Sequence, residues 1–144
     1  SPATASKELR LLKKESLLKE RKDRIFIFYK ANLESDLYRD SKIFYNIRKI
    51  KESKFIEELN KFYLKPTIIL FGSASHGLDD ETSDIDLAVI SENTKSITNI
   101  KEFGKKINKR IQLFVLKDVK EIKNKHLVNN IINGIVIQGQ VKWI

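Results

Sequence analysis

The sequence contains no cysteine among its 144 residues, which excludes disulfide bonds, thiolate metal sites and cysteine nucleophiles. It also lacks long hydrophobic runs. The longest ones, such as "TIILF" and "IQLFVL", are far shorter than the roughly 18 residues that a membrane-spanning helix needs. We therefore expect a soluble cytoplasmic protein with no signal peptide and no membrane partner. The length suits one ordinary domain, or a compact domain with a smaller appendage.

Acidic residues are scarce relative to basic ones, above all in the first half of the chain. The formal net charge is +9, and residues 1–65 carry seventeen Lys/Arg against ten Asp/Glu, whereas residues 66–144 carry eleven against nine. A positive surface attracts nucleic acid or other anionic partners, because binding releases condensed counterions. Lysine-rich faces are also common on helices that are merely solvated. The charge alone leaves both interpretations open.

The N-terminal segment is expected to form a helix followed by a β-hairpin. Ser1 and Pro2 suit the N-cap and the first helical position, since proline has a fixed φ and no N–H to satisfy. Apolar residues then recur at helical spacing, and two extended segments follow around a polar turn near residues 22–24. The hairpin should carry Ile25, Ile27 and Tyr29 on one face and Phe26 and Phe28 on the other.

The stretch "SPATASKELRLLKKESLLKE" resembles the turn, recognition helix and first wing strand of a winged helix-turn-helix domain. Two further helices that precede this point in that family have no counterpart in the sequence, so the resemblance is to part of the domain. It implies binding of duplex DNA. The alternative is a basic helix and hairpin that only pack on their neighbour. The candidate DNA-binding residues are Lys7, Arg10, Lys13, Lys14, Arg21, Lys22 and Arg24.

Two more helices are predicted before residue 67, in "ESDLYRDSKIFYNIRKIK" and "SKFIEELNKFYLKP". Ser53 is a candidate N-cap of the second helix, and Pro66 should end it. We interpret the first as a connecting helix, although its apolar side would serve equally well as the interface of a homodimer. That side is lined by Leu37, Ile43, Phe44, Ile47 and Ile50.

From Thr67 onward the pattern changes to alternating strands and helices. Strands are expected in "TIILF", "DIDLAVI", "RIQLFVL" and "GIVIQGQVKWI", with helices around residues 97–107 and in "DVKEIKNKHLVNNIIN". The predicted fold class is α+β, with a mixed sheet and helices on one side. The expected organisation is a winged-helix-like segment at 1–32, a connecting helix at 33–52 and a catalytic-type domain at 53–144.

Two carboxylates stand one residue apart in "FGSASHGLDDETSDIDLAVI". On a strand, Asp84 and Asp86 point to the same face. Like charges at that spacing repel unless a cation lies beside them, and oxygen ligands of this kind suit magnesium together with substrate phosphates. Gly72 and Ser73 follow the preceding strand, where a small residue lets backbone N–H groups approach a phosphate.

The pattern of Gly-Ser, ten residues and Asp-Ile-Asp is similar to the signature of the DNA polymerase beta-type nucleotidyltransferase superfamily. The fuller stretch resembles the minimal nucleotidyltransferases, a small branch often paired with HEPN-type toxins. The resemblance covers roughly residues 55–139. It implies magnesium and a nucleoside triphosphate, with ATP expected, and transfer of a nucleotide to a hydroxyl acceptor, as an antitoxin acting on a HEPN-type partner. Asp84 and Asp86 would be the catalytic, metal-binding residues, and Gly72 and Ser73 would bind the nucleotide.

The sequence departs from that family pattern at two positions. His76 stands where the family commonly has arginine, and Gln112 aligns with a third carboxylate on the next strand. Glutamine cannot act as a base or bring negative charge, so a DNA-binding regulator with a weakened or inactive nucleotidyltransferase domain is the alternative function. Asp118 remains open as a substitute carboxylate, and residues 79–81 are expected to form a solvated loop.

Overall fold

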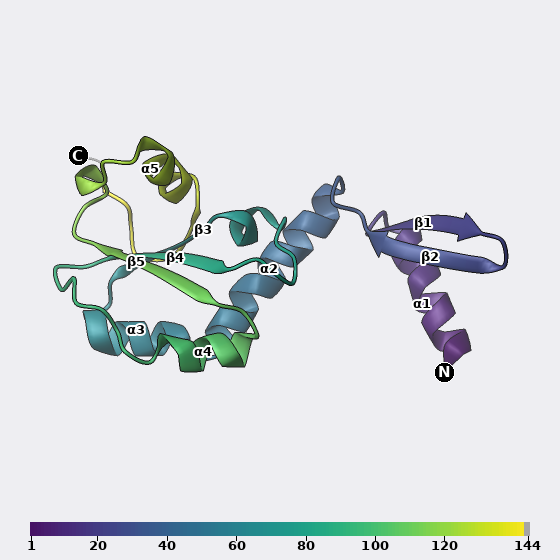
Figure 1. Ribbon diagram of the computed structural model, residues 1–144, viewed down its shortest axis with the longest axis horizontal. Coiled ribbons are helices and arrows are strands. Elements are labelled where there is room, and N and C mark those ends of the chain that lie inside the picture. The colour runs from purple at the N-terminus through teal and green to yellow at the C-terminus, as the bar shows by residue number, and fades with distance from the viewer. Residues whose placement is uncertain (143–144) are drawn as a thin grey trace.

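The computed structural model describes residues 1–142, which form an elongated molecule (Figure 1). A helix, α1 (Pro2–Lys14), packs beside a hairpin of β1 (Leu18–Asp23) and β2 (Phe26–Ala31) at one end of it. The long helix α2 (Asp36–Glu52) leads from this end into a sheet-containing body. The first buried residue of the chain is Asn46, so the helix and hairpin lie outside the core.

The N-terminal elements follow the local sequence closely. The Ser1 hydroxyl accepts a hydrogen bond from the N–H of Thr4 at 3.3 Å, which confirms the expected cap. The hairpin closes through a two-residue turn of Arg24 and Ile25, with Arg24 at φ 55°, because short hairpin turns need positive φ. Ile25 therefore lies in the turn, and its expected place on a strand face is wrong.

Helix α2 is only partly covered by the body. Ile50 is buried and Ile47 packs against the same core. Leu37 and Phe44 are 52% and 65% exposed, because the first half of the helix projects beyond the body toward the hairpin (Figure 1). The expected continuous apolar stripe is thus buried only toward its C-terminal end.

The second middle helix, α3 (Phe55–Tyr63), starts one residue later than its predicted cap implies. Lys54 occupies the N-cap position at φ 68°, and the Ser53 hydroxyl accepts the N–H of Phe55 at 3.2 Å. The helix ends at Tyr63 and Leu64, before Pro66. Ser53 still accepts a hydrogen bond from an N-terminal N–H group of the helix, although it lies one residue before the N-cap.

Four strands form the central sheet in the order β5-β4-β3-β6. The two central strands, β3 and β4, are antiparallel, β6 pairs antiparallel with β3, and β5 pairs parallel with β4. Because β3 and β4 read as continuous apolar runs, both of their faces need cover. The strands are β3 (Thr67–Phe71), β4 (Ile85–Ile90), β5 (Ile111–Leu116) and β6 (Ile135–Gln138).

Helices cover both faces of this sheet. Alternate residues such as Ile68 and Leu87 pack with α3 and with α4 (Ile100–Ile107), while Ile69 and Ala88 pack with α5 (Lys125–Ile132) on the other face. Figure 1 shows α5 on the side of the sheet opposite to α3 and α4. The mixed α+β fold class is confirmed. The expectation that helices lie on one side is corrected, because the second apolar face recruits α5.

The C-terminal elements are shorter than expected. A one-turn helix, η2 (Val119–Glu121), and α5 take the place of one long helix, and β6 ends at Gln138. The remainder of the expected last strand includes residues 143–144, which lie outside the described residues. Within residues 1–142, no helix is long and apolar enough to cross a membrane.

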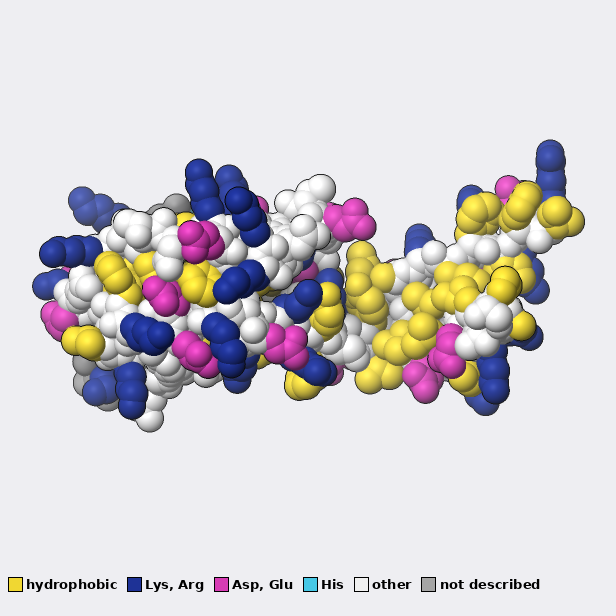
Figure 2. All heavy atoms as spheres, turned by 90° about the horizontal axis from the view of Figure 1, so that it is seen from below, with side chains coloured by type: hydrophobic (Ala, Val, Ile, Leu, Met, Phe, Trp, Pro, Cys, Tyr) yellow, Lys and Arg dark blue, Asp and Glu magenta, His cyan; other side chains and the backbone are white. Residues whose placement is uncertain are grey.

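The N-terminal end of the molecule exposes many apolar side chains between basic ones (Figure 2). Helix α1 buries none of its residues. This surface is therefore both apolar and positively charged, unlike the mixed-charge surface of the body. The large exposed hydrophobic residues there are Leu11, Ile25, Phe26, Ile27, Phe28 and Leu33.

Candidate active site around Asp84 and Asp86

The site begins where β3 ends. Phe71 pairs with Asp86 across the antiparallel strands, so the next residue, Gly72, lies against the Asp86 carboxylate. A Cβ added to Gly72 would collide with Oδ2 of Asp86, and Gly72 has φ 73° and ψ −160°. Only glycine adopts that conformation readily. The glycine thus leaves room for a carboxylate beside the backbone.

A short 3-10 helix, η1 (Ser73–His76), follows directly. Gly77 ends it at φ 69°, where a Cβ would meet the backbone of Arg39 in α2. Gly77 therefore lets the chain turn sharply at the end of this helix. Within residues 1–142, the Ser73 hydroxyl has no hydrogen-bond partner, so it is available to a ligand.

The two carboxylates and Gln112 share one face of the sheet. Asp86 is in register with Gln112 on the parallel strand β5, and Asp84 precedes the first residue of β4. Oδ2 of Asp84 accepts hydrogen bonds from Nη2 of Arg110 at 2.5 Å and from Nε2 of Gln112 at 2.7 Å. Gln112 therefore lies beside the carboxylate pair, and Arg110 joins it.

The carboxylates have opposite electrostatic environments. The hydrogen bond from Arg110 holds the pKa of Asp84 below its ordinary value. Burial, and then the charge of Asp84, raise the pKa of Asp86. Asp86 has no hydrogen bond or ion pair among the described residues. It is a partly desolvated carboxylate that no cation contacts directly, and the charge of Arg110 offsets the rise of its pKa only in part.

These residues fit one divalent cation. The unpartnered Asp86 carboxylate, with Asp84 two residues away on the same face, supplies oxygen ligands of the kind that magnesium takes. Among residues 1–142 there is no group of three or more His, Cys, Asp or Glu side chains arranged to hold a metal. At the position where the family pattern has a third carboxylate, Gln112 offers only a neutral amide. The donor set is therefore that of a single-cation site completed by a phosphate ligand.

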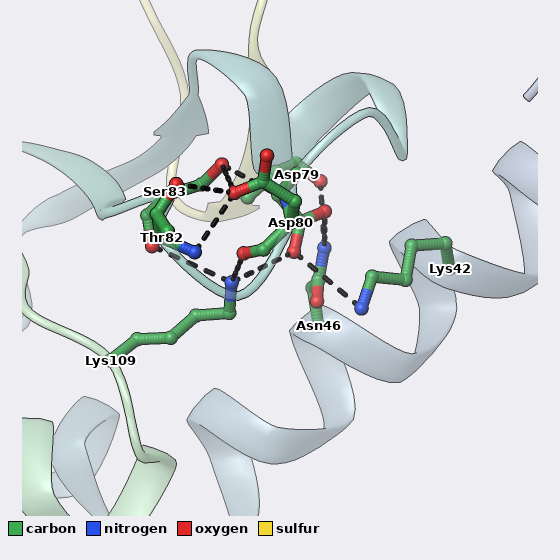
Figure 3. A network of polar contacts seen from close by, with 8 residues as sticks. Lys42, Asn46, Asp79, Asp80, Thr82, Ser83 and Lys109 are labelled. Carbon is green, nitrogen blue, oxygen red and sulfur yellow. Dashed lines mark hydrogen bonds and ion pairs between the residues drawn. The ribbon is translucent and has the colours of Figure 1, made fainter.

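The loop before Asp84 is held by a buried polar network (Figure 3). The Asp79 side chain is fully buried; it accepts a hydrogen bond from Asn46 at 2.7 Å and lies 3.6 Å from Nζ of Lys42 and 3.3 Å from Nζ of Lys109. The expectation of a solvated loop is wrong at Asp79, because two lysines and the amide of Asn46 surround its carboxylate in place of solvent. Asp80 caps the same loop by accepting bonds from Thr82 and Ser83.

The other charged candidates lie apart from the carboxylates. His76 is exposed at the end of η1. Asp118 caps η2 by accepting the N–H of Lys120 at 2.9 Å. It lies beyond the end of β5 opposite to Gln112, about 20 Å away at the usual rise of a strand. Asp118 therefore does not replace the missing carboxylate.

The basic residues of the site, Lys109 and Arg110, are not among those predicted from the sequence. Lys109 donates to the backbone carbonyl of Asp80, and the adjacent Arg110 holds Asp84. The available signal was their place directly before the strand that carries Gln112. Parallel pairing of that strand with β4 brings them beside the carboxylates.

Four of the seven candidate DNA-binding residues line one groove. Arg10, Lys13, Lys14 and Lys22 line one groove of about 740 Å³ between α1 and the hairpin, whereas Lys7, Arg21 and Arg24 lie outside it. Glu20 in that groove is 3.5 Å from Nζ of Lys13 and 3.9 Å from Nζ of Lys22. The guanidinium of Arg21 lies 5.1 Å from the ring centre of Phe28. Part of the positive charge is thus already balanced within the protein.

Comparison with known proteins agrees with this geometry. The family described as "Nucleotidyltransferase domain" matches residues 52–137, which is more than half of the chain. The chain belongs to the nucleotidyltransferase domain family. The match spans Gly72, Ser73, Asp84, Asp86 and Gln112.

A similar solved structure is described as "Crystal structure of the toxin-antitoxin with AMP-PNP". It is 23% identical to this nucleotidyltransferase-family chain, with a TM-score of 0.46, and the alignment covers 61% of this chain and 73% of that one. No curated protein matches the chain significantly.

Proposed function

We propose that the protein transfers a nucleoside monophosphate from a nucleoside triphosphate, with ATP expected, to a hydroxyl acceptor. One observation carries the proposal: the Asp86 carboxylate lies against the backbone of Gly72 with no hydrogen bond or ion pair among the described residues, two residues from Asp84 on the same face. A carboxylate without a direct partner, beside a glycine that opens a short helix, suits a magnesium-bound triphosphate. Membership of the nucleotidyltransferase family supports the same reaction.

Asp84 and Asp86 would hold magnesium, and Gly72 and Ser73 would hold the phosphates. Bound magnesium would neutralise phosphate charge and align the leaving group. The acceptor oxygen forms a bond to the α-phosphorus, the bond from that phosphorus to the bridging oxygen breaks, and pyrophosphate leaves. The acceptor proton passes to water, because Gln112 cannot accept it.

The acceptor proposed on the resemblance to minimal nucleotidyltransferases is a HEPN-type toxin, with this protein as its antitoxin. A protein acceptor would have to approach the exposed edge beside β5, where Arg110 is 71% exposed. The nucleotide site itself does not identify the acceptor. This partner is therefore tested separately from nucleotide binding.

Nucleotide binding is tested by titration calorimetry with ATP and magnesium. Wild type should bind ATP only with magnesium present, and the double variant Asp84→Asn, Asp86→Asn should bind at least about tenfold more weakly, since it removes the cation ligands without changing shape. Asp118→Asn is the matched control, because that carboxylate caps a distant helix. Equal isotherms for wild type and the double variant would place the site elsewhere.

A second candidate function is DNA binding by residues 1–32, with the nucleotidyltransferase domain as a weak or inactive partner. Residues 1–30 carry nine Lys/Arg against four Asp/Glu, and four of the basic side chains line one groove. The exposed apolar residues of the hairpin would also suit a protein partner or a homodimer. The groove and the apolar surface support different partners, and the salt dependence of DNA retention distinguishes between them.

A further inference from the structure

Arg110 is fixed beside the carboxylates by the sheet itself. Its carbonyl accepts the N–H of Ile85 at 2.9 Å, which starts the parallel pairing of β4 and β5. The backbone of Arg110 therefore lies alongside that of Asp84, and the two side chains meet at 2.5 Å. No loop movement is needed to form this ion pair.

The guanidinium of Arg110 uses only part of its hydrogen-bonding capacity. Arginine has five N–H donors, and the structure shows one donated to Oδ2 of Asp84. The Arg110 side chain is 71% exposed and that of Asp84 24% exposed. The remaining donors belong to a largely exposed side chain and are therefore free to contact an anionic ligand.

The charges of the site limit how many cations it can take. Asp84 and Asp86 contribute two negative charges and Arg110 one positive charge, while Gln112 is neutral. The charge of Lys109 is paired with that of the buried Asp79. The protein therefore offers one net negative charge there. A pair of divalent ions about 4 Å apart needs several anionic ligands to offset their mutual repulsion, and one net charge is too little.

We propose that Arg110 is a built-in cation of this site, which takes the place of a second metal ion and restricts the protein to one divalent cation on the Asp86 side. This inference rests on the proposed function and deepens it. Arg110 holds Asp84, and its free N–H groups would be available to the phosphates of a bound nucleotide. Arg110 is a positioning residue whose charge sets the metal stoichiometry.

The test measures manganese binding by electron paramagnetic resonance in the absence of nucleotide, with circular dichroism as the check of folding. Wild type should take up one Mn²⁺ per chain. Arg110→Gln should tighten that binding by about tenfold, since it removes a unit charge a few ångströms from a divalent ion. Arg110→Gln combined with Gln112→Asp should take up two.

Two further variants separate charge from packing. Arg110→Lys keeps the charge and should bind like wild type, and so should Arg48→Gln, which removes an exposed arginine paired with Glu52 on α2. Two ions in wild type, or an affinity of Arg110→Gln within twofold of wild type, would overturn the inference and leave the proposed function standing. Folded wild type that takes up no Mn²⁺ would overturn the inference alone, because in the proposed function the nucleotide phosphates complete the cation site; the calorimetric ATP titration tests that function separately.

Discussion

Gln112 is in register with Asp86 and donates its amide N–H to Asp84. In the proposed function it would steady one carboxylate while leaving the attacking hydroxyl without a base. A positioned base typically accelerates a reaction by about 10²–10⁴-fold, so wild-type transfer should be slow even where ATP binds well.

Gln112→Asp should accelerate transfer by about ten- to hundredfold, less than a fully adapted base supplies. The measurement follows label from α-phosphate-labelled ATP into a HEPN-type toxin supplied as acceptor. Gln112→Asn is the matched control, because it keeps an amide and adds no carboxylate. Fast transfer by wild type that is unchanged or reduced in Gln112→Asp would show that another group acts as the base.

The carboxylate of Asp86 should cost stability at neutral pH. Burial raises its pKa in the folded protein, so the folded state binds a proton more readily than the unfolded chain does. The contribution of Asp86 to the free energy of unfolding is therefore lost as the pH rises through the pKa of Asp86 in the folded protein. It is recovered as the pH falls. A cation beside Asp86 would remove the same cost at neutral pH.

Asp86→Asn should therefore raise the melting temperature by a few degrees at pH 7 and leave it unchanged near pH 3. Asp84→Asn should act in the opposite direction at pH 7, because Arg110 lowers the pKa of Asp84. Thermal unfolding followed by circular dichroism at both pH values measures this. A lower melting temperature for Asp86→Asn at pH 7 would contradict the assigned burial cost.

Among the elements of the fold, the loop between η1 and β4 is tied to α2 and to the turn before β5. Asp79 provides the link, through Asn46 and Lys42 on α2 and through Lys109. The next residues run directly into Asp84. The network thus links α2 to the loop that positions Asp84.

Asp79→Asn should lower the free energy of unfolding by about 3 kcal/mol, the low end for breaking a buried ion pair, because both lysines keep partial exposure to water. ATP affinity should fall as well, since the loop leads to Asp84. Urea denaturation and calorimetry measure the two effects. Glu81→Gln, an exposed neighbour, is the control and should change stability by less than about 0.5 kcal/mol. Equal effects of the two variants would refute the role of Asp79.

Across the molecule, the core and the N-terminal elements are separable. No residue before Asn46 is buried, and both clusters of the core are built from residues after it, with Ile47 packed at the edge. The basic groove belongs to α1 and the hairpin alone. Removing residues 1–32 should therefore leave the sheet and the nucleotide site intact.

A chain of residues 33–144 should bind ATP within about twofold of the full chain and should not retain duplex DNA on filters. The full chain should retain DNA with a log–log salt slope of about −4 if four or five basic groups contact phosphates. Lys101→Gln with Lys105→Gln, both exposed on α4, is the control. Failure of the full chain to retain DNA at low salt would favour a protein partner or a homodimer on this surface.

Local structure and the placing of the two carboxylates could be predicted from the sequence alone. Ser1 caps α1, and the apolar runs form β3, β4 and β5. The glycine at 72 stands directly after β3, where the structure places it beside the Asp86 carboxylate. These features depend on neighbours along the chain, through side-chain periodicity, capping and φ preference. Gln112 was found from the resemblance to the family pattern, which aligns it with a third carboxylate, and its register with Asp86 agrees with that alignment.

The grouping of distant residues into one site, in contrast, depends on the tertiary contacts. Asp79 reads as a solvated loop residue until α2 and Lys109 are placed around it, and Arg110 gains its role only from the parallel pairing of β5 with β4. The placement of α5 on the second face likewise depends on sheet order. Burial, ion pairing and sheet order arise from contacts between residues far apart in the chain, which local sequence patterns do not encode.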